Sequence, residues 1–361
     1  MNYQHQKYNT DSEVSVHLIV HNGEKYISKC LEALAKQTYT NIRVRVFDNA
    51  STDSTRDLAK NMYPGAEIIK FNKNYILGGG FNRSLYYTKS PYVVGLSVDV
   101  LIAPDFIEKA VLAMEENKKA GVLQAKILRW DFEKNKKTKI IDTTGMQIFK
   151  SRRIINRGHG EEDKEQYDTP EEIFCYEGAV PFFRREALED AKMDKFKPFY
   201  APYTDSADRA RYPYEYLDED FIWYADEVDL GWRLRLLGWG SWYEPTVRAW
   251  HDRQTTHTLS GSHKNFIKHR KTVPAFKRKL DFQNQRLTFI KNDFWVNMLL
   301  DAPWFLKREL FLFVYILIWE RSSLGAYLNI VRMLPKMIKK RRIIMNKKTV
   351  SANEMREWFK S

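Results

Sequence analysis

The chain has 361 residues, of which 43% are hydrophobic and 14% aromatic, and its net charge is +13. This composition suffices for a large buried core and excludes disorder as the default interpretation. The charge is uneven, because residues 262–361 hold 22 Lys and Arg against 7 Asp and Glu, whereas residues 1–261 are slightly acidic. The two cysteines, Cys30 and Cys175, are too few for a disulfide framework or a thiolate zinc site and favour the cytosol.

From residue 14 onward, strand-like apolar runs alternate with segments of helical spacing. Strands are expected at 14–20, 42–50, 66–71 and 92–100, and helices at 24–37, 54–61 and 81–88, the last preceded by a glycine-rich loop. This alternation predicts an α/β fold with a mostly parallel sheet, and ligands bind outside the carboxyl ends of such strands.

The middle of the chain is more polar. Residues 130–175 are expected to form solvated turns around a short strand at 145–149, and residues 205–215 to form a loop. Between them, "GAVPFFRREAL" (178–188) predicts a strand that leads into a helix.

The C-terminal third changes character, with Lys and Arg clusters between aromatic and aliphatic segments. Two or three amphipathic helices are expected there. The longest apolar run, Leu310 to Trp319, has ten residues, about half of a membrane span, so we expect no transmembrane helix. The N-terminus lacks the apolar core of a signal peptide, so no export is expected.

Polar residues stand at the ends of two predicted strands, and glycines follow a third. Asp48 and Asn49 suit a nucleotide base or ribose, but Asp-Asn at a strand end is also a common turn. Asp99 suits a divalent cation with phosphate oxygens, or else a simple turn. The glycines at 78–80 permit close approach to an anion or a flexible turn.

The stretch "YADEVDLGWR" (224–233) has three acids in four residues. On a helix, Glu227 lies about 100° from Asp226 and about 200° from Asp229, so the acids cannot share one face. Asp229 and Arg233, at i,i+4, favour a mutual ion pair, and acids in a first turn also suit the helix dipole. His251, after a further strand, could equally be a packed residue.

Taken in order, these motifs resemble the family-2 glycosyltransferases of the GT-A fold, especially the rhamnosyltransferase-like branch. The resemblance covers about residues 14–255 and rests on "VSVHLIVHNGEKYISKCLEAL", "VFDNASTDST", "NYILGGGFNRS", "LSVDV", "GAVPFFRREAL" and "DEVDLGWRLRLLGW". It implies a Rossmann-like nucleotide-sugar-binding fold with a mixed, mostly parallel sheet.

The resemblance also implies roles for individual residues. Glu227 matches the catalytic base, with Asp226 as the rival because the acid pair is reversed here. Asp99 and His251 match a site for Mg²⁺ or Mn²⁺, and Asp229 and Arg233 support the helix. The implied nucleotide-sugar contacts are Val20, Asn22, Asp48, Asn49, Gly79, Gly80, Asn82 and Ser97.

The expected activity is an inverting transfer of rhamnose or a similar hexose from a dTDP- or UDP-linked donor to a glycan or polyprenyl-linked acceptor, in cell-surface polysaccharide synthesis. A galactofuranosyltransferase-like enzyme and a non-catalytic sugar-nucleotide-binding scaffold remain alternatives, the latter because of the reversed acid pair and the altered metal motif.

The expected organisation is a tail at 1–13, a GT-A domain at 14–258 with a nucleotide-binding half (14–100) and an acceptor-binding half (101–258), and a basic helical region at 259–361. The basic flanks and apolar runs of this last region favour an anionic membrane surface on the cytoplasmic side over a nucleic acid.

Overall fold

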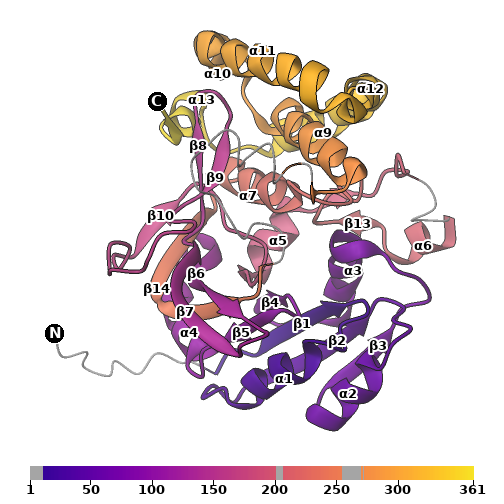
Figure 1. Cartoon of the computed structure of the whole chain (residues 1–361), viewed down its shortest axis with the longest axis vertical. Coiled ribbons are helices and arrows are strands. Elements are labelled where there is room, and N and C mark those ends of the chain that lie inside the picture. Colours follow the sequence, from indigo (N-terminus) through magenta and orange to yellow (C-terminus); the bar gives the residue numbers. More distant parts are fainter. Residues whose placement is uncertain (1–10, 201–205, 254–269, 271) are drawn as a thin grey trace.

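The first four strands form the parallel part of a ten-stranded sheet in the computed structural model, which describes residues 11–200, 206–253, 270 and 272–361 (Figure 1). These strands are β1 (Val14–Val20), β2 (Ile42–Asp48), β3 (Glu67–Lys70) and β4 (Tyr92–Leu96). β1 lies between β2 and β4, and β3 adds beyond β2. All seven residues of β1 are buried, as its uninterrupted apolar sequence predicts for a strand covered on both faces.

Antiparallel pairing extends the sheet beyond β4. β11 (Phe182–Arg184) joins β4 to β6 (Ala120–Asp131), and β14 (Gly240–His251) runs parallel to β6. The remaining strands are β5 (Val100–Ile102) and β10 (Glu171–Ile173), which pair with β14, and β7 (Lys136–Thr143), which pairs with β6. The mixed sheet confirms the predicted α/β class.

Helices cover both faces of the sheet, and each face has its own hydrophobic core. One core joins the sheet to α1 (Ile27–Ala35) and α4 (Phe106–Glu116). The other joins it to α3 (Ile76–Ser84), α5 (Arg185–Ala191) and α7 (Asp226–Leu236). The smaller elements are α2 (Thr55–Met62), η1 (Leu85–Tyr87), β12 (Met193–Asp194), α6 (Ser206–Arg211) and β13 (Tyr214–Glu215).

The C-terminal helices stack on the α7 side of the sheet domain (Figure 1). They are α9 (Ala275–Asn292), α10 (Trp295–Leu300), α11 (Ala302–Trp319), η2 (Arg321–Ser323), α12 (Gly325–Lys347) and α13 (Ala352–Arg356). β15 (Phe359–Lys360) then pairs with β8 (Met146–Phe149), which also pairs with β9 (Ile154–Asn156). Ile344 of α12 belongs to the same core as Trp232 of α7, so these helices are integral to the fold.

No single described helix is long and apolar enough to cross a membrane. The pair formed by α11 and the segment Arg321–Lys347 passes the length and composition requirements only together, and it is bent by 119°.

Several sequence predictions are corrected by the structure. The third helix begins at Ile76, so the three glycines lie inside α3 rather than in a loop before it. The fourth strand stops at Leu96, and Asp99 lies in the turn before β5. Residues 130–175 hold strands β7 to β10, and the described part of 205–215 forms α6 and β13. Where two or three C-terminal helices were expected, the described residues from 272 to 361 form five α-helices. In each case tertiary pairing outweighs a weak local signal.

The predicted boundary at residues 258 and 259 lies outside the described residues, as do residues 1–10 of the predicted tail. This division of the chain stays a prediction.

Candidate active site

The acid pair begins helix α7 directly after a left-handed turn. Tyr224 and Ala225 have φ values of 69° and 65°, a conformation that costs a non-glycine residue about 1–2 kcal/mol. Such strain persists only where surrounding contacts hold it. The turn aims the first residues of α7, Asp226 and Glu227, at the same cavity.

The contacts that hold this turn come from the C-terminal helices. The side-chain amide of Asn284, on α9, donates hydrogen bonds to the carbonyl oxygens of Trp223 and Tyr224 at 2.8 and 3.1 Å. Asn284 is completely buried. The position of the acid pair therefore depends on a helix that lies outside the sheet domain.

The two carboxyl groups have perturbed acidities. Burial raises the pKa of Glu227 well above its ordinary value, and the adjacent Asp226 raises it further. Burial also raises the pKa of Asp226. Two carboxylates that share one enclosed site resist double ionisation, so one of the pair keeps its proton to a higher pH than an isolated carboxyl group would.

A cavity of about 210 Å³ lies between the carboxyl ends of the strands and α7. Its apolar wall includes Ile19, Phe81 and Phe183, and its polar lining includes Glu177 and Ser97 together with Asp226, Glu227 and His251. The predicted base and one predicted metal ligand thus line one space, although 24 residues separate them in the chain.

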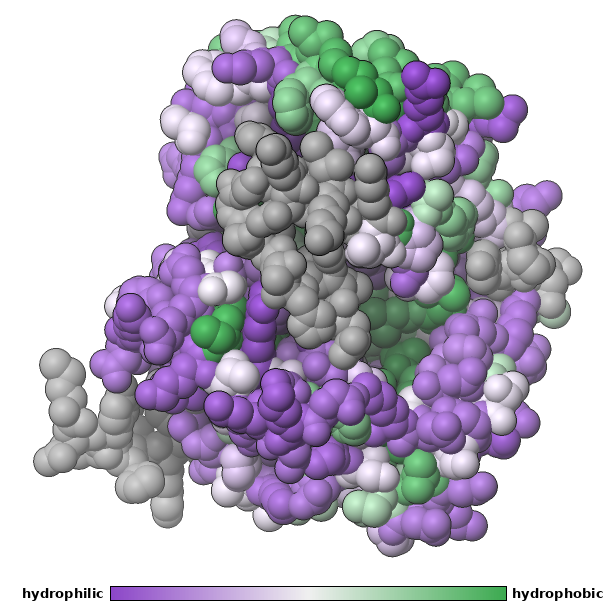
Figure 2. All heavy atoms as spheres, in the orientation of Figure 1, coloured by the Kyte–Doolittle hydropathy of each residue, from purple (hydrophilic) through white to green (hydrophobic). Residues whose placement is uncertain are grey.

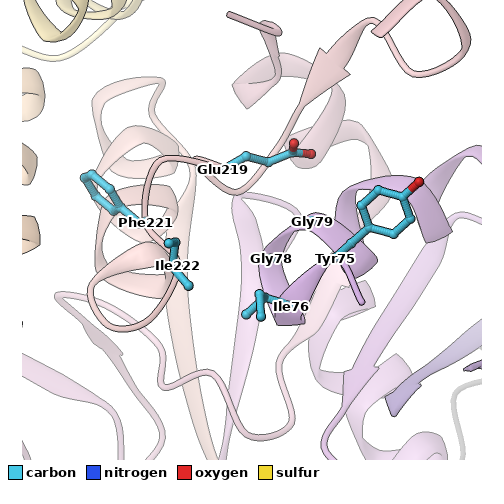
Figure 3. Close-up of a pocket in the computed structure, with 7 residues that line it drawn as sticks. All are labelled: Tyr75, Ile76, Gly78, Gly79, Glu219, Phe221 and Ile222. Carbon is cyan, nitrogen blue, oxygen red and sulfur yellow. The ribbon is translucent and has the colours of Figure 1, made fainter. Parts of the chain in front are cut away.

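A smaller hollow lies beside this cavity, between the first turn of α3 and the segment before α7 (Figure 3). Its lining residues are Tyr75, Ile76, Gly78, Gly79, Glu219, Phe221 and Ile222. A Cβ atom on Gly78 would lie 3.7 Å from the Asp226 carboxylate. The first turn of α3 therefore lies within van der Waals reach of the acid pair.

Asp99 and His251 face each other, as the metal hypothesis requires. The Nε2 atom of His251 lies 3.4 Å from Oδ2 of Asp99. The opposite ring nitrogen, Nδ1, donates a hydrogen bond of 2.9 Å to Asp142, on β7. Arg253 pairs with the same Asp142 carboxylate at 2.7 Å and with Glu177 at 2.6 Å. The ring orientation of His251 is therefore fixed.

This surrounding charge controls the protonation of the histidine. Burial alone would lower the pKa of His251, but its hydrogen bonds to Asp142 and Asp99 raise that pKa to about 10. The Asp99 carboxylate is 27% exposed. Among the described residues, no three His, Cys, Asp or Glu side chains converge on one point, so a cation here would have two protein ligands and open positions.

The predicted nucleotide contacts lie at the ends of β1 and β2, where the sheet topology puts them. Asp48 is completely buried; it accepts a hydrogen bond from the Ser51 backbone at 2.8 Å and pairs with Arg56 at 3.1 Å. Asn49 bonds the first turn of α3, accepting from the backbone of residue 75 and donating to that of residue 76. Val20 is buried, whereas Asn22 is exposed.

Other residues predicted to contact the nucleotide sugar have structural roles. A Cβ atom on Gly80 would meet Ile19 at 2.7 Å, so only glycine fits there. Gly79 is buried and its carbonyl accepts from Arg83. Asn82 is completely buried, and its amide bonds the backbone of residues 216 and 217. Ser97 lines the main cavity. Their nucleotide-sugar roles stay predictions.

Asp229 and Arg233 form the expected i,i+4 ion pair, at 3.1 Å and completely buried. Asp229 also accepts from Lys291 and Asn292, both of α9, at 2.8 Å. This residue pair therefore joins α7 to the C-terminal helices as well as supporting the helix itself.

The sequence analysis missed Asp142, Glu177 and Asn284. No local pattern could have indicated Asp142, because it lies 109 residues before its partner His251. Asn284 lies on an amphipathic helix where one more polar residue carries no signal. Glu177 stands beside a glycine, which gave only a weak sequence signal.

Comparisons with known proteins agree with this geometry. Residues 15–191 match the family described as "Glycosyl transferase family 2". The chain is 26% identical to "Chondroitin synthase" from Escherichia coli over 148 residues, which are 40% of this chain and 19% of that protein. It is 27% identical to "Putative glycosyltransferase EpsE" from Bacillus subtilis over 127 residues, 34% of this chain and 46% of that protein. The aligned regions span less than half of either relative.

Among solved structures, a match is "GalNAc-T7 with UDP, GalNAc and Mn2+", with a TM-score of 0.51 and 12% identity over 77% of this chain and 51% of that chain. This likeness concerns the fold alone, which is the GT-A fold with added C-terminal helices. Residues 15–191 thus match the family-2 glycosyltransferase model, and the fold has the predicted architecture.

Proposed function

We propose that this chain, whose residues 15–191 belong to glycosyl transferase family 2, transfers a sugar from a nucleoside diphosphate to an acceptor hydroxyl with inversion at the anomeric carbon. One observation carries the proposal: the acid pair and His251, which lies 3.4 Å from Asp99, line one cavity at the carboxyl ends of the parallel strands. In an open α/β sheet this is the position where a bound donor meets its acceptor.

Glu227 acts as the general base. It takes the proton from the acceptor hydroxyl while that oxygen forms a bond to the anomeric carbon. The bond from that carbon to the diphosphate oxygen breaks, and the nucleoside diphosphate leaves with the electron pair. Burial and the adjacent Asp226 raise the pKa of Glu227 from its ordinary value toward the working pH, which is the direction that suits a general base. Asp226, which shares the enclosed site, orients Glu227 or replaces it in this role.

The residues beside the donor position suit Mg²⁺ or Mn²⁺. Asp99 supplies an oxygen and His251 a nitrogen, and their separation of 3.4 Å is near the edge of about 3 Å between ligands of one octahedral ion. The hydrogen bond from His251 Nδ1 to Asp142 would leave Nε2, after loss of its proton, to hold the ion. When bound, the ion supplies charge stabilisation to the departing diphosphate.

For the substrates, we propose a rhamnose-like hexose carried by dTDP or UDP and a glycan or polyprenyl-linked acceptor. Support comes from the motif resemblance to the rhamnosyltransferase-like branch and from the polymer-synthase name of one relative. A galactofuranosyltransferase-like activity would use the same acid pair. A scaffold without activity would keep donor binding and lose turnover.

Point variants of the acid pair test the proposed function. Glu227→Gln keeps the side-chain shape but removes the base, so turnover should fall by at least about 100-fold while the Kd for the donor stays nearly unchanged. Asp226→Asn is the matched variant, and its smaller loss would assign the base to Glu227. Full transfer by Glu227→Gln would refute the assignment.

A screen of nucleotide sugars by thermal shift, with and without Mn²⁺, identifies the donor. A donor that stabilises the protein only with the metal present would support both the nucleotide and the cation assignments. If no nucleotide sugar raises the melting temperature, the proposed donor class is wrong.

A further inference from the structure

The surface of α10, α11 and α12 exposes an unusual number of large apolar side chains. Across the described residues, 21 such side chains are exposed, and 16 of them lie within residues 295–334. Figure 2 shows them gathered along the top of the molecule, over α11 and α12. We call this set the apolar cap: Trp295, Val296, Leu299, Leu300, Trp304, Leu306, Leu310, Phe311, Phe313, Val314, Leu317, Ile318, Trp319, Leu328, Val331 and Leu334.

The exposure of individual residues is high. Leu299 is 75% exposed, Val331 66%, Leu310 65% and Phe311 60%. A scattered leucine on a surface needs no explanation, but a contiguous patch on neighbouring helices marks a site of interaction. The cap is therefore a surface for a partner.

The charges around the cap are of one sign. Residues 295–347 contain three acids, Asp301, Glu309 and Glu320, and all three turn inward to arginines. The exposed charged residues of this segment are basic: Lys307, Arg321, Arg332, Lys339, Arg342 and Lys347. The partner must accept apolar side chains and be negatively charged at their margin.

We propose that the apolar cap and its basic margin dock on a membrane surface that contains anionic lipid. Apolar side chains enter the boundary between headgroups and acyl chains, and each nearby Lys or Arg adds electrostatic attraction to anionic lipid. The three tryptophans suit the headgroup level, where aromatic residues concentrate. The 119° bend between α11 and the next helix fits helices that lie along an interface.

A second copy of the chain fits this surface less well. In a two-fold dimer the same patch would meet itself. The exposed cations of both copies would then approach one another, with no exposed carboxylate between 295 and 347 to pair with them. An anionic membrane satisfies both the apolar and the charged parts of the surface.

Docking through this cap also fixes the position of the active site. α9 packs against both α12 and α7, and Asn284 of α9 holds the turn before the acid pair. The cap therefore cannot move independently of Asp226 and Glu227. A membrane-docked chain holds its cavity at a set distance from the lipid surface.

Flotation of the full chain with lipid vesicles tests the proposal. The vesicles are phosphatidylcholine alone or a mixture with roughly one third phosphatidylglycerol, each at low and high salt. The chain should float with both, and at least tenfold better with the anionic vesicles at low salt. Failure to float with anionic vesicles at low salt would overturn the proposal.

Two variants separate the apolar and charged contributions. Leu310→Glu combined with Ile318→Glu, at side chains 65% and 55% exposed, should reduce flotation at least tenfold on both vesicles. Its control is Met62→Glu, at a 40% exposed site on α2, which should float like the parent chain. Arg332→Glu combined with Lys339→Glu should lose only the preference for anionic vesicles, and Lys60→Glu is its control.

Light scattering in solution distinguishes the competing occupant. If the parent chain is a dimer that Leu310→Glu with Ile318→Glu converts to a monomer while vesicle flotation is unchanged, the cap is a dimer interface and the proposal fails. Because flotation measures no sugar transfer, these outcomes do not depend on the proposed function.

Discussion

The hydrogen bonds from Asn284 to the turn before α7 allow a sharp prediction. Asn284→Ala removes two buried bonds, to the carbonyl oxygens of Trp223 and Tyr224. Each contributes about 0.5–1.5 kcal/mol net, so the free energy of unfolding should fall by about 1–3 kcal/mol. The left-handed turn then relaxes and shifts the acid pair, and a displacement of about 1 Å costs roughly 100-fold in rate.

The assay combines urea unfolding with steady-state kinetics on the full chain. We expect kcat to fall by roughly 100-fold while the Kd for the donor changes little, since α9 supplies none of the described residues that line the cavity. Asn297→Ala is the matched control, because Asn297 is equally buried and donates one hydrogen bond, of 2.7 Å, to the carbonyl of Ala352. It should lose about 0.5–1.5 kcal/mol of unfolding free energy, for one bond in place of two, without loss of kcat. An Asn284→Ala variant that is destabilised yet retains its full kcat would refute the reasoning.

Three further predictions concern the charges of the site and its supports. The pKa of Glu227 is raised in the folded state, so its contribution to the free energy of unfolding is complete below about pH 4.5 and is lost as pH rises through the folded value. Glu227→Gln should therefore flatten the pH dependence of stability measured by urea unfolding. An unchanged pH dependence would contradict this prediction. Asp142→Asn should weaken Mn²⁺ binding about 10–100-fold by freeing the ring of His251, measured by calorimetry; an unaltered Kd would show that this hydrogen bond is dispensable. Lys340→Met should cost about 3–5 kcal/mol of unfolding free energy, because it leaves buried carboxylates without their cation. The control Lys339→Met, at an exposed neighbouring residue, should cost less than about 0.5 kcal/mol. Equal losses would contradict the ion-pair argument.

The alternating pattern of the first hundred residues predicted the four parallel strands β1 to β4. β1 is an uninterrupted apolar run, and all of it is buried. The helix after the acids was predicted equally well, because Asp229 and Arg233 pair at i,i+4. The start of α3 was missed because glycine is a poor helix former, and close packing against Ile19, rather than local propensity, makes the helix there.

In the middle and C-terminal regions, the local sequence did not predict the strands. The strands between 130 and 175 carry many charged residues, and they form because β6, β8 and β14 provide partners. β15 pairs with β8 from a position more than 200 residues away. Such pairing depends on contacts that no local window contains.

By itself, the sequence determined the residue types of the site, their order, and the strand end at which Asp48 stands, because these follow from local periodicity and from motif order. The tertiary structure alone decided that His251 is held by Asp142, that Asn284 of a C-terminal helix clamps the turn before Glu227, and that the acids between 295 and 347 face inward. The physical reason is that burial, hydrogen bonding and charge pairing act through space, between groups that can lie a hundred residues apart in the chain.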